Sequence, residues 1–181
     1  MNPLTQLKKI RILPSLTVLV LTVLAALTSI PALGTPSCGV TTTNLLAPVP
    51  VGYFADGLLD LMCNEQNLYR WNLKTKVKGD SDLYVNQLTF QPGAQAGWHT
   101  HPGPSLVTVI EGTLTVYHDD CTFETYTVGE TFDDLGCGDV HNVRNETAAE
   151  AKVVSVQLVP HNVARRIDKP DPGCPQVPPC P

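Results

Sequence analysis

Short runs of alternating apolar and polar residues, rich in β-branched and aromatic side chains, recur through the second half of the chain. Alternation with a period of two is typical of half-buried β-strands. Glycine, proline and aspartate separate the runs, as turns require. Only residues 55–62 hint at a helix, so the pattern predicts an all-β sandwich or barrel. The expected strands cover residues 83–90, 105–110, 113–118, 122–127 and 152–159.

The beginning of the chain follows a different pattern. Three basic residues between positions 8 and 11 precede an apolar run over residues 15–28, and small residues at 32–34 follow it. This order is typical of a cleaved signal peptide, so we expect export and cleavage after about Gly34. An uncleaved membrane anchor is the alternative, because the run approaches the roughly 17 to 25 residues that span a bilayer.

The remaining residues suit one domain. We expect residues 1–34 to be the signal peptide and residues 35–82 to form an N-terminal arm with the first strands. Residues 83–160 would form the barrel core. Residues 161–181 would form an extended tail, because prolines fill six of its last thirteen positions and cannot donate backbone hydrogen bonds. We expect a disulfide to pin this tail.

Six cysteines lie beyond the predicted signal peptide, as expected for a protein that matures in an oxidising compartment. Fifteen pairings are open to six cysteines, and sequence alone does not choose among them. A zinc site is the competing interpretation, but the chain has no CxxC pair. Our first choice of pairs follows proximity along the chain: Cys121 with Cys137, Cys174 with Cys180, and Cys38 with Cys63.

The charge balance argues against one class of partner. The chain carries a net charge of −5, and loss of three basic residues with the signal peptide would leave −8. Nucleic-acid binding requires clustered Lys and Arg to neutralise phosphates. We therefore expect no nucleic-acid partner.

Two histidines provide the main chemical clue. His99 and His101 lie two positions apart in the stretch GWHTHPGPS, just before a predicted strand. Alternate residues of a strand face the same side, so both imidazoles would point into the barrel. His141 enters another predicted strand after a glycine-rich turn and could supply a third donor. Three neutral imidazoles at one point predict a metal site.

These residues resemble the motifs of the cupins. The first cupin motif contains a His-x-His pair followed by a glutamate and a glycine, and His99, His101 and Gly112 occupy the corresponding positions. The second contains a glycine, a histidine and an asparagine, which Gly129, His141 and Asn145 match after one extra residue. The resemblance covers residues 83–160. It implies a double-stranded β-helix, or jelly roll, with a metal inside, and it is strongest for exported single-domain cupins without an assigned reaction.

Two departures from the family pattern affect the expected site. Ser105 stands where cupins carry their metal-binding glutamate, and a hydroxyl is a poor substitute for a carboxylate. Leu135 and Cys137 replace the proline and glycine of the second motif, so that turn is rebuilt, and a disulfide could hold it. Ser105 and Asn145 are expected to line the pocket, Asn145 by parity with His141.

Without the glutamate, three imidazoles favour Fe(II), with Zn, Ni or Cu as alternatives, over the harder Mn. The resemblance then implies an exported, metal-dependent oxygenase acting on a small organic molecule, although no second catalytic residue can be named. A non-catalytic binder of a small ligand or a metal is the first alternative, and a purely structural domain is the second. Cupins often pair through edge strands, which implies a homodimer. Contact with a membrane is expected only if the signal is not cleaved.

Overall fold

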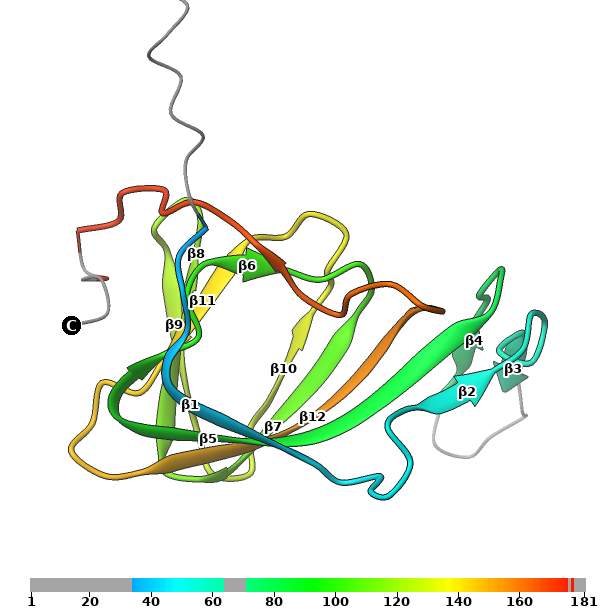
Figure 1. Cartoon of the computed structure of the whole chain (residues 1–181), viewed down its shortest axis with the longest axis horizontal. Coiled ribbons are helices and arrows are strands. Elements are labelled where there is room, and N and C mark those ends of the chain that lie inside the picture. The colour runs from blue at the N-terminus through cyan, green and yellow to red at the C-terminus, as the bar shows by residue number, and fades with distance from the viewer. Residues whose placement is uncertain (1–33, 64–70, 176, 178–181) are drawn as a thin grey trace, which may run out of the picture. The chain divides into compact units, whose positions relative to one another are not determined.

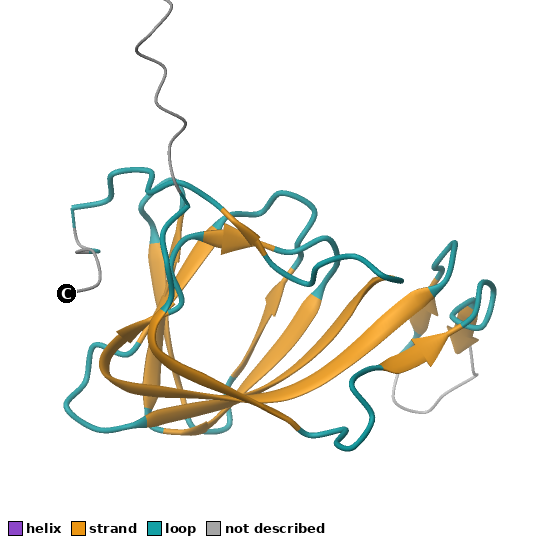
Figure 2. Ribbon diagram, in the orientation of Figure 1, coloured by secondary structure: helices purple, strands orange, loops and turns teal. Residues whose placement is uncertain are grey.

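A computed structural model describes residues 34–63, 71–175 and 177 (Figure 1). The predicted signal peptide therefore lies outside the described residues, apart from Gly34. Within the described part of the chain, no helix is long and apolar enough to cross a membrane. The all-β prediction is confirmed: these residues contain strands, turns and loops, and residues 55–62 form a turn and the start of a strand (Figure 2).

The five strands predicted from the sequence are all present, and most are longer than expected. Within the described residues they are accompanied by eight further strands, most of them two to four residues long. In chain order the strands are β1 (Cys38–Asn44), β2 (Gly52–Phe54), β3 (Leu61–Cys63), β4 (Leu73–Thr75), β5 (Ser81–Gln95), β6 (His99–Thr100), β7 (Ser105–Glu111), β8 (Thr113–His118), β9 (Phe123–Thr127), β10 (Thr131–Asp134), β11 (His141–Arg144), β12 (Ala151–Pro160) and β13 (Ile167–Asp168).

Eleven strands join in one antiparallel sheet that curls into a nearly closed jelly roll (Figure 2). One side of the roll runs in the order β10, β7, β12, β5, with β1 and β2 also paired to β5. The other side contains β9, β8, β11, β6 and β13. β5 serves both sides, because Ser81–Phe90 pair with β12 whereas Gln95 pairs with β11. β3 and β4 form a separate two-stranded sheet.

The apolar side chains divide between two clusters. The larger one fills the roll and is centred on Phe90, Val109 and Leu114, which are at most 1% exposed. The second surrounds Trp98 and includes Tyr117, Cys174 and Val177. The second cluster packs the C-terminal end of the described chain against β8. The N-terminal end is joined to the same region by a hydrogen bond, because the backbone N–H of Trp98 donates to the Thr35 hydroxyl.

The disulfide pairs predicted from proximity along the chain are wrong. Cys121 bonds to Cys174, which is 53 residues away, while Cys63 and Cys137 are free. Cys38 is also disulfide-bonded, so its partner is not Cys63. Folding brings the Cα atoms of Cys121 and Cys174 to 5.4 Å, a separation that suits a disulfide. The bond ties the tail to the turn after β8 instead of closing a loop within the tail.

Candidate metal centre

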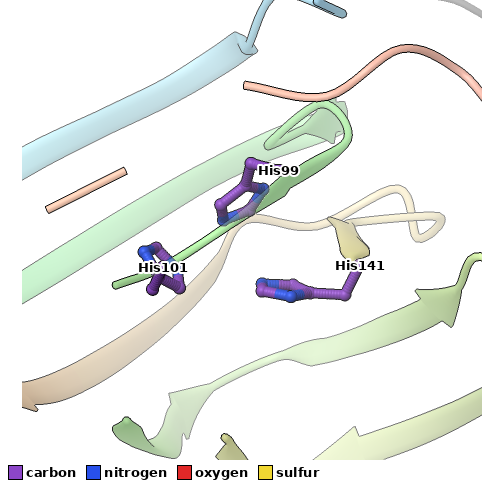
Figure 3. Close-up of side chains that lie close together, drawn as sticks. All are labelled: His99, His101 and His141. Atoms are coloured by element: carbon purple, nitrogen blue, oxygen red, sulfur yellow. The ribbon is translucent and has the colours of Figure 1, made fainter. Parts of the chain in front are cut away.

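The strand pairing brings His99 and His141 together. β6 and β11 are antiparallel neighbours in which His99 lies directly opposite His141. Directly opposed residues point to the same face, and the two ring centroids are 4.3 Å apart. The ring of His101 is 4.8 Å from that of His99 and 5.5 Å from that of His141. The predicted convergence is therefore present: one ligand atom of each ring lies within 4.8 Å of the other two (Figure 3).

Two glycine-containing turns hold the segment around His101. The backbone carbonyl of His101 accepts from the N–H of Cys137 at 2.7 Å, which joins the loop after β6 to the turn after β10. Gly136 has a φ of +64°, and a Cβ there would collide with the carbonyl of Gly103. The rebuilt turn of the second motif is thus closed by glycine conformation and backbone hydrogen bonds. Our suggestion that a disulfide holds it is wrong, because Cys137 is a free thiol.

Backbone carbonyls orient two of the three imidazoles. Nδ1 of His99 lies 2.7 Å from the carbonyl of Gly97, and Nδ1 of His101 lies 2.5 Å from the carbonyl of Arg165. Because a carbonyl oxygen can only accept, each Nδ1 carries the hydrogen and each Nε2 carries a lone pair. This arrangement is typical of metal-binding histidines, whose second nitrogen donates to a fixed acceptor.

All three rings are buried and favour the neutral form. Burial lowers the pKa of His99 well below its ordinary value, and His141, Arg166 and His101 lower it further. Burial also lowers the pKa values of His101 and His141, although the nearby carboxylate of Asp134 partly offsets the effect in both. Neutral imidazoles are the form that binds metals.

Asp134 is a site residue that the sequence analysis missed. Its side chain is buried, and its Oδ2 lies 3.1 Å from Nε2 of His101 and 3.7 Å from Nε2 of His141. The other oxygen, Oδ1, accepts from the N–H of Gly136 and is thereby fixed. β10 pairs with β7 so that Asp134 lies directly opposite Ser105, the position of the cupin glutamate. The carboxylate absent at 105 is supplied from the neighbouring strand.

The contact between His101 and Asp134 calls for a cation. The hydrogen of His101 lies on Nδ1, so its Nε2 lone pair faces a carboxylate oxygen at 3.1 Å. No other described group forms a hydrogen bond with this oxygen. Two electron-rich atoms at this distance repel unless a proton or a metal ion lies between them. Burial disfavours a second proton on His101, so the donors fit a metal ion.

Of the two predicted pocket residues, one lines the cavity and the other does not. Ser105 lines a cavity of about 230 Å³ that also contains the three histidines and Asp134. Asn145 does not line this cavity. β11 ends at Arg144, so the alternation of the strand stops before Asn145, and its amide donates instead to the carbonyls of Phe90 and Ala149. Our expectation that Asn145 faces the cavity is therefore wrong, and the residue braces the loop after β11.

The neutral histidines predict how the metal-free protein responds to acid. A ring whose pKa is lower in the folded state takes up its proton more readily when unfolded, so its contribution to stability is lost as pH falls below the unfolded value of about 6.5. For His99, whose pKa is lowered most clearly, we expect a loss of about 1.4 kcal/mol between pH 7.5 and pH 5.5. Urea unfolding of the metal-free protein and of His99→Gln at both pH values would measure this difference, and equal losses in the two proteins would contradict it.

Known proteins place this architecture in a family. Residues 86–157 match the cupin domain. This stretch contains His99, His101 and His141 and most strands of the jelly roll, so the chain contains a cupin domain over residues 86–157. No match is found among curated protein sequences.

Several solved structures are similar to this chain. A cupin domain from Bordetella pertussis is 26% identical over 42% of this chain and 80% of its own length, with a TM-score of 0.38. The polyketide cyclase RemF from Streptomyces resistomycificus is 15% identical over 77% and 79%, with a TM-score of 0.49. The cupin domain of an XRE family transcriptional regulator from Enterobacter cloacae is 15% identical over 66% and 95%, with a TM-score of 0.42. Likeness at this level carries no information about reaction or ligand.

Proposed function

We propose that this protein is an exported metal-binding cupin in which His99, His101, His141 and Asp134 hold one divalent transition metal. The observation that carries the proposal is the pair of electron-rich atoms formed by Nε2 of His101 and Oδ2 of Asp134, 3.1 Å apart in a buried cavity. The backbone carbonyl of Arg165 holds the His101 ring in this orientation. A metal ion would satisfy both atoms and the neighbouring imidazoles at once.

The donor set favours Fe(II), with Zn, Ni or Cu as alternatives. Imidazoles combined with one carboxylate resemble the donors of non-haem Fe(II) oxygenases. Asp134 also changes an argument made from the sequence, because an oxygen donor suits hard cations and weakens the case against Mn.

We further propose that the metal serves an oxygenase reaction on a small organic molecule. A bound iron would supply a Lewis acid and a redox centre. The chain would contribute the surroundings: Phe90, Phe132 and Val153 line the cavity and keep water from its apolar part. Ser105 places a hydroxyl beside the donors. The side chains that line the cavity can orient a ligand. The described lining residues do not include a nucleophile pair such as Cys with His.

The test begins with metal-free protein that has been loaded separately with Fe(II), Zn, Ni and Mn. Elemental analysis should find about one equivalent of at least one metal per chain, and less than about a tenth of an equivalent of each would overturn the proposal. Oxygen consumption by the iron-loaded protein with candidate small molecules then tests catalysis. If the fully loaded protein consumes oxygen no faster than a sample without protein, the oxygenase proposal is contradicted. The alternative of a non-catalytic protein that binds a small ligand or a metal would then remain.

Asp134 can be tested by an isosteric change. Asp134→Asn keeps the side-chain shape and the acceptor for the Gly136 N–H, but it removes the negative charge beside His101. Because Asp134 is a proposed ligand, we expect metal affinity to fall by at least the roughly 10- to 100-fold that is typical of losing a supporting carboxylate at a metal site. Competition against a metal-binding dye would measure the change. Asp133→Asn, which alters the exposed neighbour on the same strand, is the matched control, and equal affinities in the two variants would remove Asp134 from the site.

The proposed location outside the cytoplasm has one structural support. The Cys121–Cys174 disulfide is of a kind that forms and persists in oxidising compartments. The sequence pattern of residues 1–34 is consistent with that location. We accordingly propose a secreted or periplasmic protein whose partner is a small molecule and not a nucleic acid.

A further inference from the structure

A row of polar side chains crosses one wall of the cavity. Asp134 lies opposite Ser105, and Ser105 lies opposite Gln157 on the next strand, so the three side chains face the same side of the sheet. Ser105 and Gln157 are only 3% and 2% exposed. The hydroxyl of Ser105 and Oε1 of Gln157 have no hydrogen-bond partner among the described residues. Buried polar atoms are normally paired, so these two atoms indicate a ligand that pairs with them.

Two consecutive arginines line the same cavity. Arg165 and Arg166 lie between β12 and β13, and the carbonyl of Arg165 accepts from Nδ1 of His101 and from Nε2 of Gln157. The segment that carries the arginines is thus fixed both to the histidines and to the polar row. Nε of Arg166 donates to Asp168, while its buried Nη2 has no hydrogen-bond partner among the described residues.

The positive charges of both arginines act within the site. Arg165 and Arg166 line the cavity that also contains His99 and His101. Asp168 pairs with Arg166, but no described carboxylate pairs with Arg165, whose guanidinium lies 5.9 Å from the centre of the Tyr84 ring. The guanidinium of Arg165 therefore carries a positive charge that no described carboxylate neutralises, and this charge would attract an anion in the cavity.

The remainder of the cavity lining is largely apolar. Leu88, Phe90, Val107, Phe132, Val143 and Val153 line it. The volume of about 230 Å³ is below the roughly 300 to 1,000 Å³ typical of pockets for drug-sized ligands. The ligand must therefore be small, with one polar, negatively charged end and one apolar end.

We propose that the cavity binds a small hydroxycarboxylic acid with an apolar side chain. Its carboxylate pairs with Arg165 and Arg166, because the planar guanidinium fork matches a carboxylate in two parallel hydrogen bonds. Its hydroxyl donates to Oε1 of Gln157, which is held as a free acceptor because Nε2 of the same amide is already bonded to Arg165. The Ser105 hydroxyl donates to the carboxylate. This inference rests on the proposed function, since it names the substrate class of the same cavity.

The experiment compares three probes on metal-loaded wild-type protein. Mandelate has the carboxylate, the hydroxyl and an apolar ring; mandelamide lacks the charge, and phenylacetate lacks the hydroxyl. Calorimetric titration should show that mandelate binds at least about tenfold more tightly than mandelamide and also more tightly than phenylacetate. Equal affinity for mandelate and mandelamide would overturn the proposal. Displacement of mandelate by an equal concentration of inorganic phosphate would also overturn it, because the site would then recognise any anion.

Arginine variants separate recognition by the protein from simple chelation by the metal. In Arg165→Gln/Arg166→Gln the preference for mandelate over mandelamide should disappear, whereas Lys76→Gln, which removes an exposed positive charge from β4's flank, should keep it. An unchanged preference in the double variant would assign the binding to the metal and overturn the proposal. If the double variant fails to fold, Arg166→Gln alone decides, since Arg166 carries the buried Nη2 that has no hydrogen-bond partner among the described residues.

Elemental analysis of the same samples keeps the two proposals distinct. Metal at about one equivalent with no acid preference would refute the hydroxy acid and leave the metal centre standing. Absence of metal after loading would refute the proposed function on which the inference rests.

Discussion

Replacing His141 by alanine is expected to reduce metal affinity by more than about 100-fold, because loss of a donor exceeds the 10- to 100-fold cost of losing a supporting residue. His141 is one of the three clustered imidazoles. It lies opposite His99 on β6, 4% exposed, with Nε2 3.7 Å from Asp134. Its removal takes one of the three clustered imidazoles from the donor set. Titration of the metal-free variant with Co(II) or Ni(II), followed by absorption spectroscopy, would measure the loss.

His118 provides a sharp control for this experiment. It lies opposite His141 on the other neighbouring strand, β8, yet its ring is not part of the three-histidine cluster. His118→Ala should therefore retain wild-type metal content. If His141→Ala binds as well as His118→Ala, the metal lies elsewhere or is absent, and the centre assigned to this cavity is wrong.

Removal of the Cys121–Cys174 disulfide is expected to lower the free energy of unfolding by about 4 kcal/mol. A bond between residues 53 apart restricts the unfolded chain strongly, and chain-entropy arguments place loops of this length between about 3 and 4.7 kcal/mol. The effect also has a folded-state part, because Cys174 packs with Trp98 and Tyr117 in the second apolar cluster. Urea unfolding of Cys121→Ala/Cys174→Ala against the wild type would measure it.

Cys137→Ala is the matched control, because Cys137 is an exposed free thiol. Its unfolding free energy should change by no more than about 0.5 kcal/mol. A loss below about 1 kcal/mol in the double variant would show that the tail is held by packing alone and that the covalent link adds little.

The sequence predicted the parts of the structure that repeat locally. The alternation of apolar and polar residues predicted β5, β7, β8, β9 and β12. The alternation of side-chain direction along a strand, together with the motif spacing, predicted that His99, His101 and His141 lie close together. Those signals depend on residues close in the chain or on a shared family pattern. They do not contain the order in which strands lie side by side.

Two of the missed features depend on how distant parts of the chain lie side by side. Asp134 reaches the histidines because β10 lies beside β7, which places it opposite Ser105. One local signal pointed to it: Phe132 and Asp134 are two residues apart, so a strand that buries Phe132 also turns Asp134 inward. The Cys121–Cys174 bond depends on where the tail returns, and no spacing rule contains that information. For Asn145 the parity argument failed because the strand ended one residue earlier.

The carbonyl of Arg165 links the segment between β12 and β13 to the proposed metal site. It connects the tail segment to the ring of His101 and to the amide of Gln157. A metal ion that fixes the His101 ring should also reduce local opening of residues 163–168. Conversely, a change that increases opening of these residues should weaken metal binding, because linkage is reciprocal. Amide hydrogen exchange in this stretch would then report whether the centre is loaded.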